Sequence, residues 1–293
     1  MLAGVFSYLK HPIWTVWQFV VAPRHALRNT VIVLAAFHRT LVLGRRAVRV
    51  LRSHYPGGGG RHPQRPWSDA GRGRYIWRVA HVFWARWILR FAGVGLTTVG
   101  YERIDWRQPY VIVANHQSTV DILALVAIMD NGRFVAKREV LHYPVLSGAA
   151  RYGGQIVIDR GDHVQSMAAI RAGMRQWPSC HIIFCPEGTR TRTGELGPFR
   201  LGAFAVAQEM RLAIVPVAIS GAFEALRKGS LLRLRRHPQI RVEFGDPIPV
   251  GAATKDEIPR LAAVVRERIT GMLAATPADG SGSVGRHAST RSA

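Results

Sequence analysis

The sequence predicts an α/β fold in which helices cover a mostly parallel, mixed sheet. Beyond Gly95, short runs rich in β-branched residues alternate with longer helical stretches, a pattern typical of layered domains built around a parallel sheet. Polar motifs follow several of the apolar runs directly, which is where a parallel sheet places a functional site. At 293 residues, the chain is long enough for one such domain with short additions at either end.

The elements of this domain are expected in the following order. A helix at 75–91 comes first, because Trp and other apolar residues recur there at helical spacing with Arg and His between them. This mixture favours either a membrane interface or a helix that covers the sheet. The strands are expected at Leu96–Tyr101, Tyr110–Ala114, Arg133–Ala136, Gln155–Ile158, His181–Phe184, Ile214–Ile219 and Ile240–Phe244. Further helices are expected at Thr119–Met129, His163–Gln176, Arg200–Met210 and Lys255–Ala274.

The N-terminal segment is both apolar and basic. Residues 1–23 carry a single formal charge, at Lys10, and a second apolar stretch covers 29–37. Charged residues interrupt both stretches before they reach the length of a spanning helix, about 20 residues. We therefore expect helices that lie at an anionic membrane surface; the alternative is a helical hairpin packed on the rest of the protein. Residues 1–23 lack the form of a removable signal peptide.

These features divide the chain into four parts. A hydrophobic and basic helical membrane anchor is expected at 1–55, a Gly- and Pro-rich linker at 56–72, one catalytic domain at 73–274 and a disordered tail at 275–293. The linker has no apolar periodicity and many helix-breaking residues. The tail has almost no large apolar side chains with which to form a core.

The charge balance implies a polyanionic neighbour. The formal net charge is +22, from 40 Lys and Arg against 18 Asp and Glu. Nucleic acid and an anionic lipid surface both fit this charge, although no recognised nucleic-acid module appears in the sequence. The cysteines, Cys180 and Cys185, are too few and too close to staple a domain. We expect reduced thiols and no metal site, because no Cys or His pair stands nearby at ligand spacing.

A His and an Asp mark the first candidate site. Asn115-His116 directly follows an expected strand, and Ser118 or Thr119 can cap a helix that begins at once. His116 should therefore lie at a strand-to-helix corner, where Asp121 in the first helical turn can reach back to the imidazole. A carboxylate on one ring nitrogen leaves the other free to take a proton, as acyl transfer to an alcohol requires. Taken alone, the spacing is also that of an ordinary surface or capping pair.

The run Phe184-Cys185-Pro186-Glu187-Gly188-Thr189-Arg190 follows another expected strand. Pro and Gly force a sharp exit from the sheet, so that backbone N–H groups and the Arg190 guanidinium can converge on one point. A phosphate suits that point, because Arg binds it with paired hydrogen bonds. Glu187 is expected to orient Arg190 or to bind a substrate hydroxyl. An isolated motif of this kind is also common in solvated turns.

Two further motifs lie at expected strands. The third motif consists of Gly154-Gln155-Ile156-Val157-Ile158-Asp159-Arg160 together with Ala136-Lys137-Arg138-Glu139, and each run combines an apolar strand with charged residues at its end. The fourth motif is the apolar run at 214–221, which contains Pro216 and so predicts an edge or irregular strand near an acyl-chain site. Individually, both motifs have the composition of core strands with polar ends.

Taken together, the four motifs resemble the four blocks of the glycerolipid acyltransferase family, most closely the bacterial 1-acyl-glycerol-3-phosphate acyltransferases. The resemblance covers about residues 75–250, and Cys185 stands where the family usually has Phe or Val. It implies a glycerol-3-phosphate acyltransferase-like fold. It also implies transfer of a fatty acyl group from acyl-CoA or acyl-carrier protein to the sn-2 hydroxyl of lysophosphatidic acid, giving phosphatidic acid in phospholipid biosynthesis. Other acceptors stay open: glycerol 3-phosphate, another lysophospholipid or an aminolipid.

The resemblance implies a role for each matching residue. His116 would be the base and Asp121 its orienting partner. The glycerol phosphate would be bound by Glu187, Gly188, Thr189 and Arg190, and Lys137 and Arg160 would add positive charge for the phosphate or the donor. The family uses direct attack in a ternary complex, so no acyl-enzyme intermediate and no cofactor beyond the thioester co-substrate are implied. This agrees with the sequence, because neither Ser118 nor Ser220 stands in a nucleophile-elbow context.

The implied partners are a membrane phospholipid surface, the acyl-CoA or acyl-carrier-protein donor and lysophosphatidic acid, and not nucleic acid. The expected location is the cytoplasmic face of the cell membrane, as a peripheral protein or with a single N-terminal anchor. The alternative from a different class is a basic nucleic-acid-binding protein, which the net charge of +22 alone would also suit.

Overall fold

The computed structural model describes residues 82–142, 154–159, 161–177, 179–226, 237–251 and 255–276. The predicted anchor at 1–55 and linker at 56–72 lie outside these ranges, as do residues 75–81 of the first predicted helix and the tail beyond Thr276. Within the described ranges, no helix is both long enough and apolar enough to cross a bilayer.

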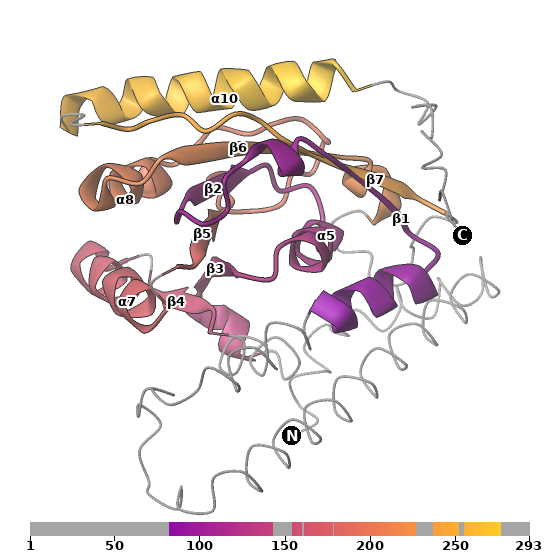
Figure 1. Cartoon of the computed structure of the whole chain (residues 1–293), viewed down its shortest axis with the longest axis horizontal. Coiled ribbons are helices and arrows are strands. Elements are labelled where there is room, and N and C mark those ends of the chain that lie inside the picture. The colour runs from indigo at the N-terminus through magenta and orange to yellow at the C-terminus, as the bar shows by residue number, and fades with distance from the viewer. Residues whose placement is uncertain are drawn as a thin grey trace, which may run out of the picture.

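Seven strands form one mixed sheet (Figure 1). They are β1 (Gly95–Val99), β2 (Val111–Ala114), β3 (Gly132–Lys137), β4 (Ile156–Ile158), β5 (His181–Phe184), β6 (Ile214–Ser220) and β7 (Gln239–Phe244). Their order across the sheet is β1-β7-β6-β2-β5-β3-β4, and every neighbouring pair is parallel except β6 and β7. The predicted fold class is confirmed, and each predicted strand is present within two residues of its expected bounds.

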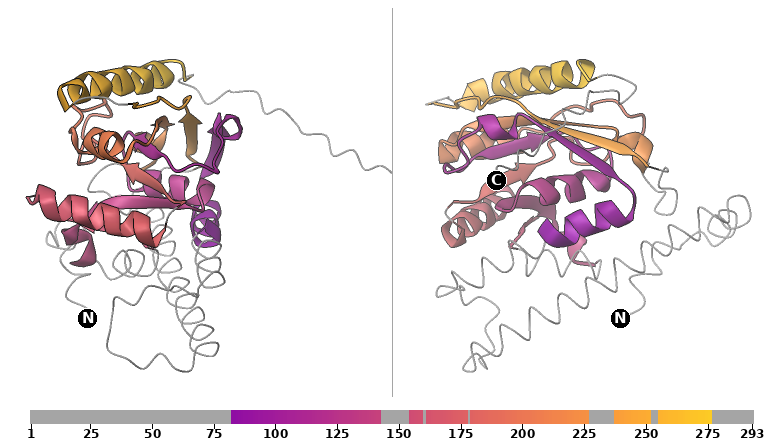
Figure 2. Two further views of the ribbon diagram at one scale, coloured as in Figure 1. Left: turned by 60° about the vertical axis from the view of Figure 1, so that its left-hand side comes forward. Right: turned by 45° about the vertical axis from the view of Figure 1, so that its right-hand side comes forward.

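Helices cover both faces of this sheet. Residues 82–91, α5 (Val120–Ile128) and α9 (Ala222–Ala225) pack on one face, and α7 (His163–Gln176), α8 (Gly202–Met210) and α10 (Ile258–Ala274) pack on the other. Figure 2 shows α7, α8 and α10 on the side of the sheet opposite the helix at 82–91. The short 3-10 helices are η2 (Tyr101–Arg103), η3 (Arg138–His142) and η4 (Lys255–Glu257). The sequence did not predict α9, because four residues are too few to show helical periodicity.

One edge of the sheet collects several chain segments. The ends of β2, β5 and β6 lie at this edge, which we call the carboxyl edge. Because β7 runs against β6 and β1 runs with β7, the starts of β1 and β7 lie there as well: Ser220 pairs with Arg241, and Gly95 pairs with Gln239. The loops that follow β2 and β5 carry the first two sequence motifs, so both motifs meet at the carboxyl edge.

Pro216 lies inside the sheet, and the prediction of an edge strand was wrong. β6 lies between β2 and β7, and Pro216 pairs with Val113 of β2. The predicted irregularity is present on the β7 side. Val217 pairs with Phe244 and Ile214 pairs with Ile248, so the two β6 residues between these pairs face three residues of the opposite segment. This register leaves one extra residue opposite Pro216. The strand tolerates proline there because its missing N–H faces an interrupted stretch of the ladder.

Candidate active site

Asn115 ties the end of β2 to β6. Its buried side chain donates from Nδ2 to Ile219 O (2.9 Å) and accepts at Oδ1 from Ile219 N (2.7 Å). These two bonds extend the pairing of the strands by one residue, so the chain is fixed up to the residue before His116. His116 then leaves the sheet at the corner between β2 and α5, where the sequence predicted it.

The side chains of His116 and Asp121 meet at this corner. His116 Nδ1 lies 2.9 Å from Asp121 Oδ2, and the two side chains are 16% and 1% exposed. Because a carboxylate can only accept, Nδ1 carries the proton and Nε2 is left as an acceptor. Among the described residues, none forms a hydrogen bond with Nε2. The pair is therefore arranged to take a proton from a group that approaches Nε2.

The backbone fixes the orientation of Asp121. The oxygen that contacts His116 also accepts from the backbone N–H groups of Gln117 and Ser118, each at 2.7 Å. Ser118 Oγ accepts from Val120 N at 3.3 Å, so Ser118 supplies a cap bond at the start of α5, whereas the side chain of Thr119 makes none. These bonds hold the carboxylate in place independently of the imidazole.

The turn after β5 brings Arg190 to the same corner. Gly188 has a φ of +74°, a backbone conformation that glycine adopts without strain, and its N–H donates to Cys185 O (3.0 Å). Beyond this turn, Arg190 Nη1 donates to Thr119 Oγ1 at 2.8 Å. The guanidinium therefore lies beside the first turn of α5, which also carries Asp121.

Glu187 does not orient Arg190, and that alternative was wrong. Its carboxylate instead accepts from two backbone N–H groups, those of His116 (Oε1, 2.7 Å) and Gly197 (Oε2, 2.9 Å). A Cβ at position 197 would lie 3.0 Å from Oε2, so glycine permits this close approach. Glu187 thus tethers His116 to the turn after β5; a contact with a substrate hydroxyl stays a prediction.

Burial raises the pKa of the Glu187 carboxyl, and the N–H groups of His116 and Gly197 oppose this shift by stabilising the charged form. The raised pKa shows that the loss of hydration outweighs the two hydrogen bonds.

The loop between Arg190 and α8 is hydrogen-bonded to the corner. Thr191 N donates to His116 O (3.0 Å), and Gln117 Nε2 donates to Gly194 O (3.1 Å). On its other side, the loop is held by Arg266 of α10, which donates to Leu196 O (3.1 Å) and Gly197 O (3.3 Å). A continuous set of hydrogen bonds therefore runs from α10 through the loop and Glu187 to His116.

The remaining predicted site residues are less closely associated with His116. Gly188 and Thr189 lie in the turn that precedes Arg190. Lys137 ends β3, two strands from β2 and therefore roughly 10 Å away along the carboxyl edge. The ion pair recorded for Lys137 is with Glu139 (Nζ–Oε1 3.8 Å). Arg160 lies outside the described residues, and the predicted binding roles of Lys137 and Arg160 stay predictions.

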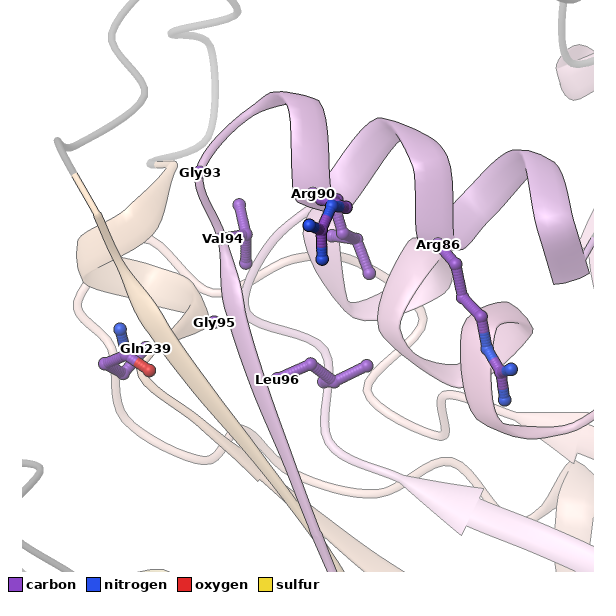
Figure 3. Close-up of a pocket in the computed structure, with 8 residues that line it drawn as sticks. Arg86, Arg90, Gly93, Val94, Gly95, Leu96 and Gln239 are labelled. Carbon is purple, nitrogen blue, oxygen red and sulfur yellow. The ribbon is translucent and has the colours of Figure 1, made fainter. Parts of the chain in front are cut away.

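No group of three potential metal ligands occurs within the described ranges. Cys180 and Cys185 form no disulfide, and burial raises the pKa of the Cys180 thiol to about 11. A hollow of about 400 Å³ lies between the helix at 82–91 and the start of β1 (Figure 3). Its lining includes Arg86, Arg90 and Gln239, but neither residue of the His-Asp pair. The hollow is thus a separate feature at the carboxyl edge.

A protein-family model described as Acyltransferase matches residues 95–220. Human 1-acyl-sn-glycerol-3-phosphate acyltransferase alpha is 32% identical over 195 residues, which cover 65% of this chain and 68% of the human protein. The chain belongs to the acyltransferase family. The 1-acyl-sn-glycerol-3-phosphate acyltransferase of Saccharomyces cerevisiae is 30% identical to this acyltransferase over 193 residues, 62% of this chain and 60% of the yeast protein.

The fold of this acyltransferase is also that of a solved structure. The 1-acyl-sn-glycerophosphate acyltransferase PlsC of Thermotoga maritima superposes with a TM-score of 0.63, covering 85% of this chain and 97% of that chain at 19% identity. Such a likeness concerns the fold alone. The family match from 95 to 220 includes the His-Asp pair and Arg190, whereas Arg266 lies beyond it.

The sequence alone missed three contacts in the acyltransferase site. Asn115 and Thr119 stand inside the first motif, so their positions were a signal, but their partners are 104 and 71 residues away. Arg266 carries no signal, because it is one of several exposed Arg residues on α10 and lies 70 residues from Leu196.

Proposed function

We propose that this O-acyltransferase moves a fatty acyl group from an acyl-CoA or acyl-carrier-protein thioester to the sn-2 hydroxyl of lysophosphatidic acid, giving phosphatidic acid in phospholipid biosynthesis. One observation carries the proposal: the first turn of α5 orients both His116, through Asp121, and Arg190, through Thr119. A base beside a guanidinium suits an acceptor whose hydroxyl and phosphate are close together. The names of the human and yeast relatives support this acceptor.

The reaction begins when the acceptor hydroxyl approaches His116 Nε2. The hydroxyl oxygen attacks the thioester carbonyl, and its proton passes to Nε2 while Asp121 stabilises the imidazolium through Nδ1–H. A C–O bond forms, the C–S bond breaks, and the imidazolium returns the proton to the departing thiolate. The acceptor itself is the nucleophile, so no covalent acyl-enzyme is required.

Arg190 contributes by fixing the acceptor. Its guanidinium can bind a phosphomonoester through two parallel hydrogen bonds, which limits where the neighbouring hydroxyl can lie. Holding a hydroxyl within reach of a base supplies much of an enzyme's rate acceleration, because the entropy cost of orienting the reacting groups is met when the substrate binds.

The test is a panel of defined acceptors and donors. We expect turnover to be fastest with lysophosphatidic acid and slower with glycerol 3-phosphate, with lysophospholipids that carry a larger head group and with aminolipids. Running each acceptor with oleoyl-CoA and with oleoyl-acyl-carrier protein identifies the donor. Equal or better turnover of an acceptor that lacks the phosphomonoester would refute the assignment of lysophosphatidic acid.

We also propose that the enzyme works at the cytoplasmic face of the cell membrane, as a peripheral protein or through a single N-terminal anchor, and needs no cofactor beyond its thioester co-substrate. The net charge of +22 and the apolar, basic composition of residues 1–55 support the membrane surface. Fractionation of cells before and after a high-salt wash distinguishes the two forms of attachment, since salt releases only a peripheral protein.

A further inference from the structure

We infer that Thr119 is a positioning residue that sets acceptor specificity, by holding the Arg190 guanidinium at a fixed place relative to His116. The inference rests on the proposed function, in which Arg190 binds the acceptor phosphate. It goes beyond that function because it assigns a role to a residue that neither takes the proton nor binds the phosphate.

The contact itself is short and directional. Thr119 Oγ1 accepts from Arg190 Nη1 at 2.8 Å, and both side chains are partly buried. A hydrogen bond from a charged donor in such a place is stronger than one between neutral groups. A guanidinium carries five N–H donors, and the bond to Thr119 occupies one of them.

The hydroxyl of Thr119 is well suited to fix a long side chain. Thr is β-branched and stiff, and residue 119 is followed by Val120 and Asp121, both buried in the first turn of α5. Arg has many rotamers, and their restriction opposes binding. A preformed bond to a rigid oxygen restricts the guanidinium before the acceptor arrives, which strengthens the binding of a phosphate.

The position of Thr119 relates the phosphate site to the base. Asp121, two residues further along the same turn, contacts the His116 imidazole. One rigid turn therefore fixes the positions of both the base and the guanidinium. It so determines which spacing between hydroxyl and phosphate an acceptor must have to reach both groups. Without the Thr119 hydroxyl, Arg190 can still bind a phosphate, but it lacks the contact that relates its position to the first turn of α5.

The hydroxyl can be removed without removing a helix cap. Thr119 is the N-cap residue of α5, yet its side chain makes no cap hydrogen bond. Thr119→Val keeps the β-branched shape and deletes only the acceptor, and Thr119→Ser keeps the acceptor. Thr98→Val, at an exposed position on the edge strand β1, is a matched control remote from the corner.

The experiment is a double-mutant cycle. Wild type, Thr119→Val, Arg190→Gln and the double variant are assayed with oleoyl-CoA and either 1-oleoyl lysophosphatidic acid or 1-oleoylglycerol, which lacks the phosphate. We expect Thr119→Val to raise KM for lysophosphatidic acid about 5- to 10-fold, with kcat within about twofold. Thr119→Ser and Thr98→Val should stay within about twofold of wild type. With 1-oleoylglycerol as the acceptor, Thr119→Val should have no effect, because there is no phosphate for Arg190 to bind. In the Arg190→Gln background it should have no further effect, because the guanidinium that Thr119 positions is absent.

Each other outcome overturns the inference. Effects of Thr119→Val and Arg190→Gln that multiply mean that the two residues act independently. A loss of kcat on both acceptors, or a Thr119→Ser variant that behaves like Thr119→Val, means that residue 119 supports the fold alone. If Thr119→Val does not fold, Thr119→Ala replaces it in the cycle, with melting temperatures as the check. A wild type that prefers 1-oleoylglycerol refutes the proposed function itself, and the inference with it; a wild type that prefers lysophosphatidic acid with multiplying effects refutes the inference alone.

Discussion

At the scale of single residues, the base is held from two directions. Asp121 fixes the imidazole ring through Nδ1, and Glu187 fixes the backbone N–H of the same residue. The first contact sets the tautomer and the direction of Nε2. The second contact fixes the position of the His116 backbone, from which the side chain extends. Substitutions at the two acids should therefore have different consequences, although both lie within hydrogen-bond distance of His116.

The first prediction concerns the base. His116→Ala should lower kcat by about 10²- to 10⁴-fold, the usual contribution of a positioned general base. The fold should persist, because Asp121 keeps its bonds to the N–H groups of Gln117 and Ser118. Steady-state kinetics and thermal denaturation measure the two effects. His163→Ala, at an exposed position on α7, is the control, and turnover near the wild-type rate in His116→Ala would mean that the base is elsewhere.

The second prediction separates positioning by Glu187 from substrate binding. In Glu187→Gln, one carboxylate oxygen becomes an NH₂ group, so either His116 N or Gly197 N loses its acceptor. We expect kcat to fall about 10-fold, equivalent to about 1.4 kcal/mol, with KM for the acceptor within about twofold. Glu195→Gln, at an exposed position in the same loop, should leave both constants unchanged. A rise in KM with kcat preserved would instead indicate direct contact with the substrate.

The raised pKa of Glu187 predicts how stability depends on pH. A carboxyl whose folded-state pKa lies above its unfolded-state pKa binds its proton more tightly when folded. Its stabilising contribution is therefore present at low pH and lost as the pH rises through the folded-state pKa. Relative to Glu187→Gln, the wild type should gain unfolding free energy as the pH falls from neutral toward the ordinary range of a Glu carboxyl. Denaturation of both proteins across this range measures the difference, and a constant difference would contradict the raised pKa.

At the scale of elements, the active-site loop depends on a helix outside the motifs. Arg266 on α10 holds the carbonyl groups of Leu196 and Gly197, and Gly197 N is the second donor to Glu187. Because the guanidinium is exposed, each bond is weak on its own. Their joint effect is to limit the positions of the loop that is hydrogen-bonded to the corner.

The prediction at this scale is that Arg266→Met lowers kcat by about two- to fivefold, since two exposed hydrogen bonds contribute on the order of 1 kcal/mol. Met keeps the length of the side chain and removes its donors. The matched control is Arg268→Met, two residues along the same helix and also exposed. Kinetics of both variants, with their melting temperatures, test this. Equal effects of the two substitutions would show that the loop does not need Arg266.

The sequence predicted the elements better than it predicted their partners. Strands such as β2 are buried on both faces, so they appear as continuous apolar runs that are easily recognised. Pro216 was misplaced because the tolerance of an inner strand for proline depends on β7, whose antiparallel register is not visible in the apolar pattern. A local pattern cannot contain such a distant pairing.

The same limit explains the error at Glu187. Glu187 and Arg190 are close in sequence and opposite in charge, which favours a local ion pair. Gly188, with its positive φ, redirects the chain between them, and each side chain bonds to a residue of the β2–α5 corner 71 positions away. The motifs predicted which residues lie at this corner, such as His116, Asp121 and Arg190, while the orientation of their side chains depends on contacts that only the folded chain supplies.

At the scale of the whole molecule, the carboxyl edge combines the active-site corner with a basic and apolar surface. The helix at 82–91 ends there, since β1 begins at this edge. Phe91 is 46% exposed and stacks on Trp87 at 5.1 Å between ring centroids. Arg86 and Arg90 line the adjacent hollow (Figure 3). Aromatic and Arg side chains together are typical of surfaces that contact lipid head groups. With this edge toward a bilayer, a lipid hydroxyl would reach His116 without leaving the interface.

This orientation predicts how the full chain binds vesicles. Binding should be stronger to phosphatidylglycerol vesicles than to phosphatidylcholine vesicles, and should weaken as salt rises, because the net charge of +22 attracts anionic head groups through a screened field. Phe91→Ser should weaken binding about fivefold, since the exposed part of the Phe91 ring would be buried in the bilayer and its loss costs on the order of 1 kcal/mol of binding free energy. Val264→Ser is the matched control: Val264 is 43% exposed, close to the value for Phe91, and lies in the middle of α10, in the opposite helical layer. Sedimentation with vesicles measures all three proteins, and equal losses for the two serine variants would mean that the carboxyl edge does not face the membrane.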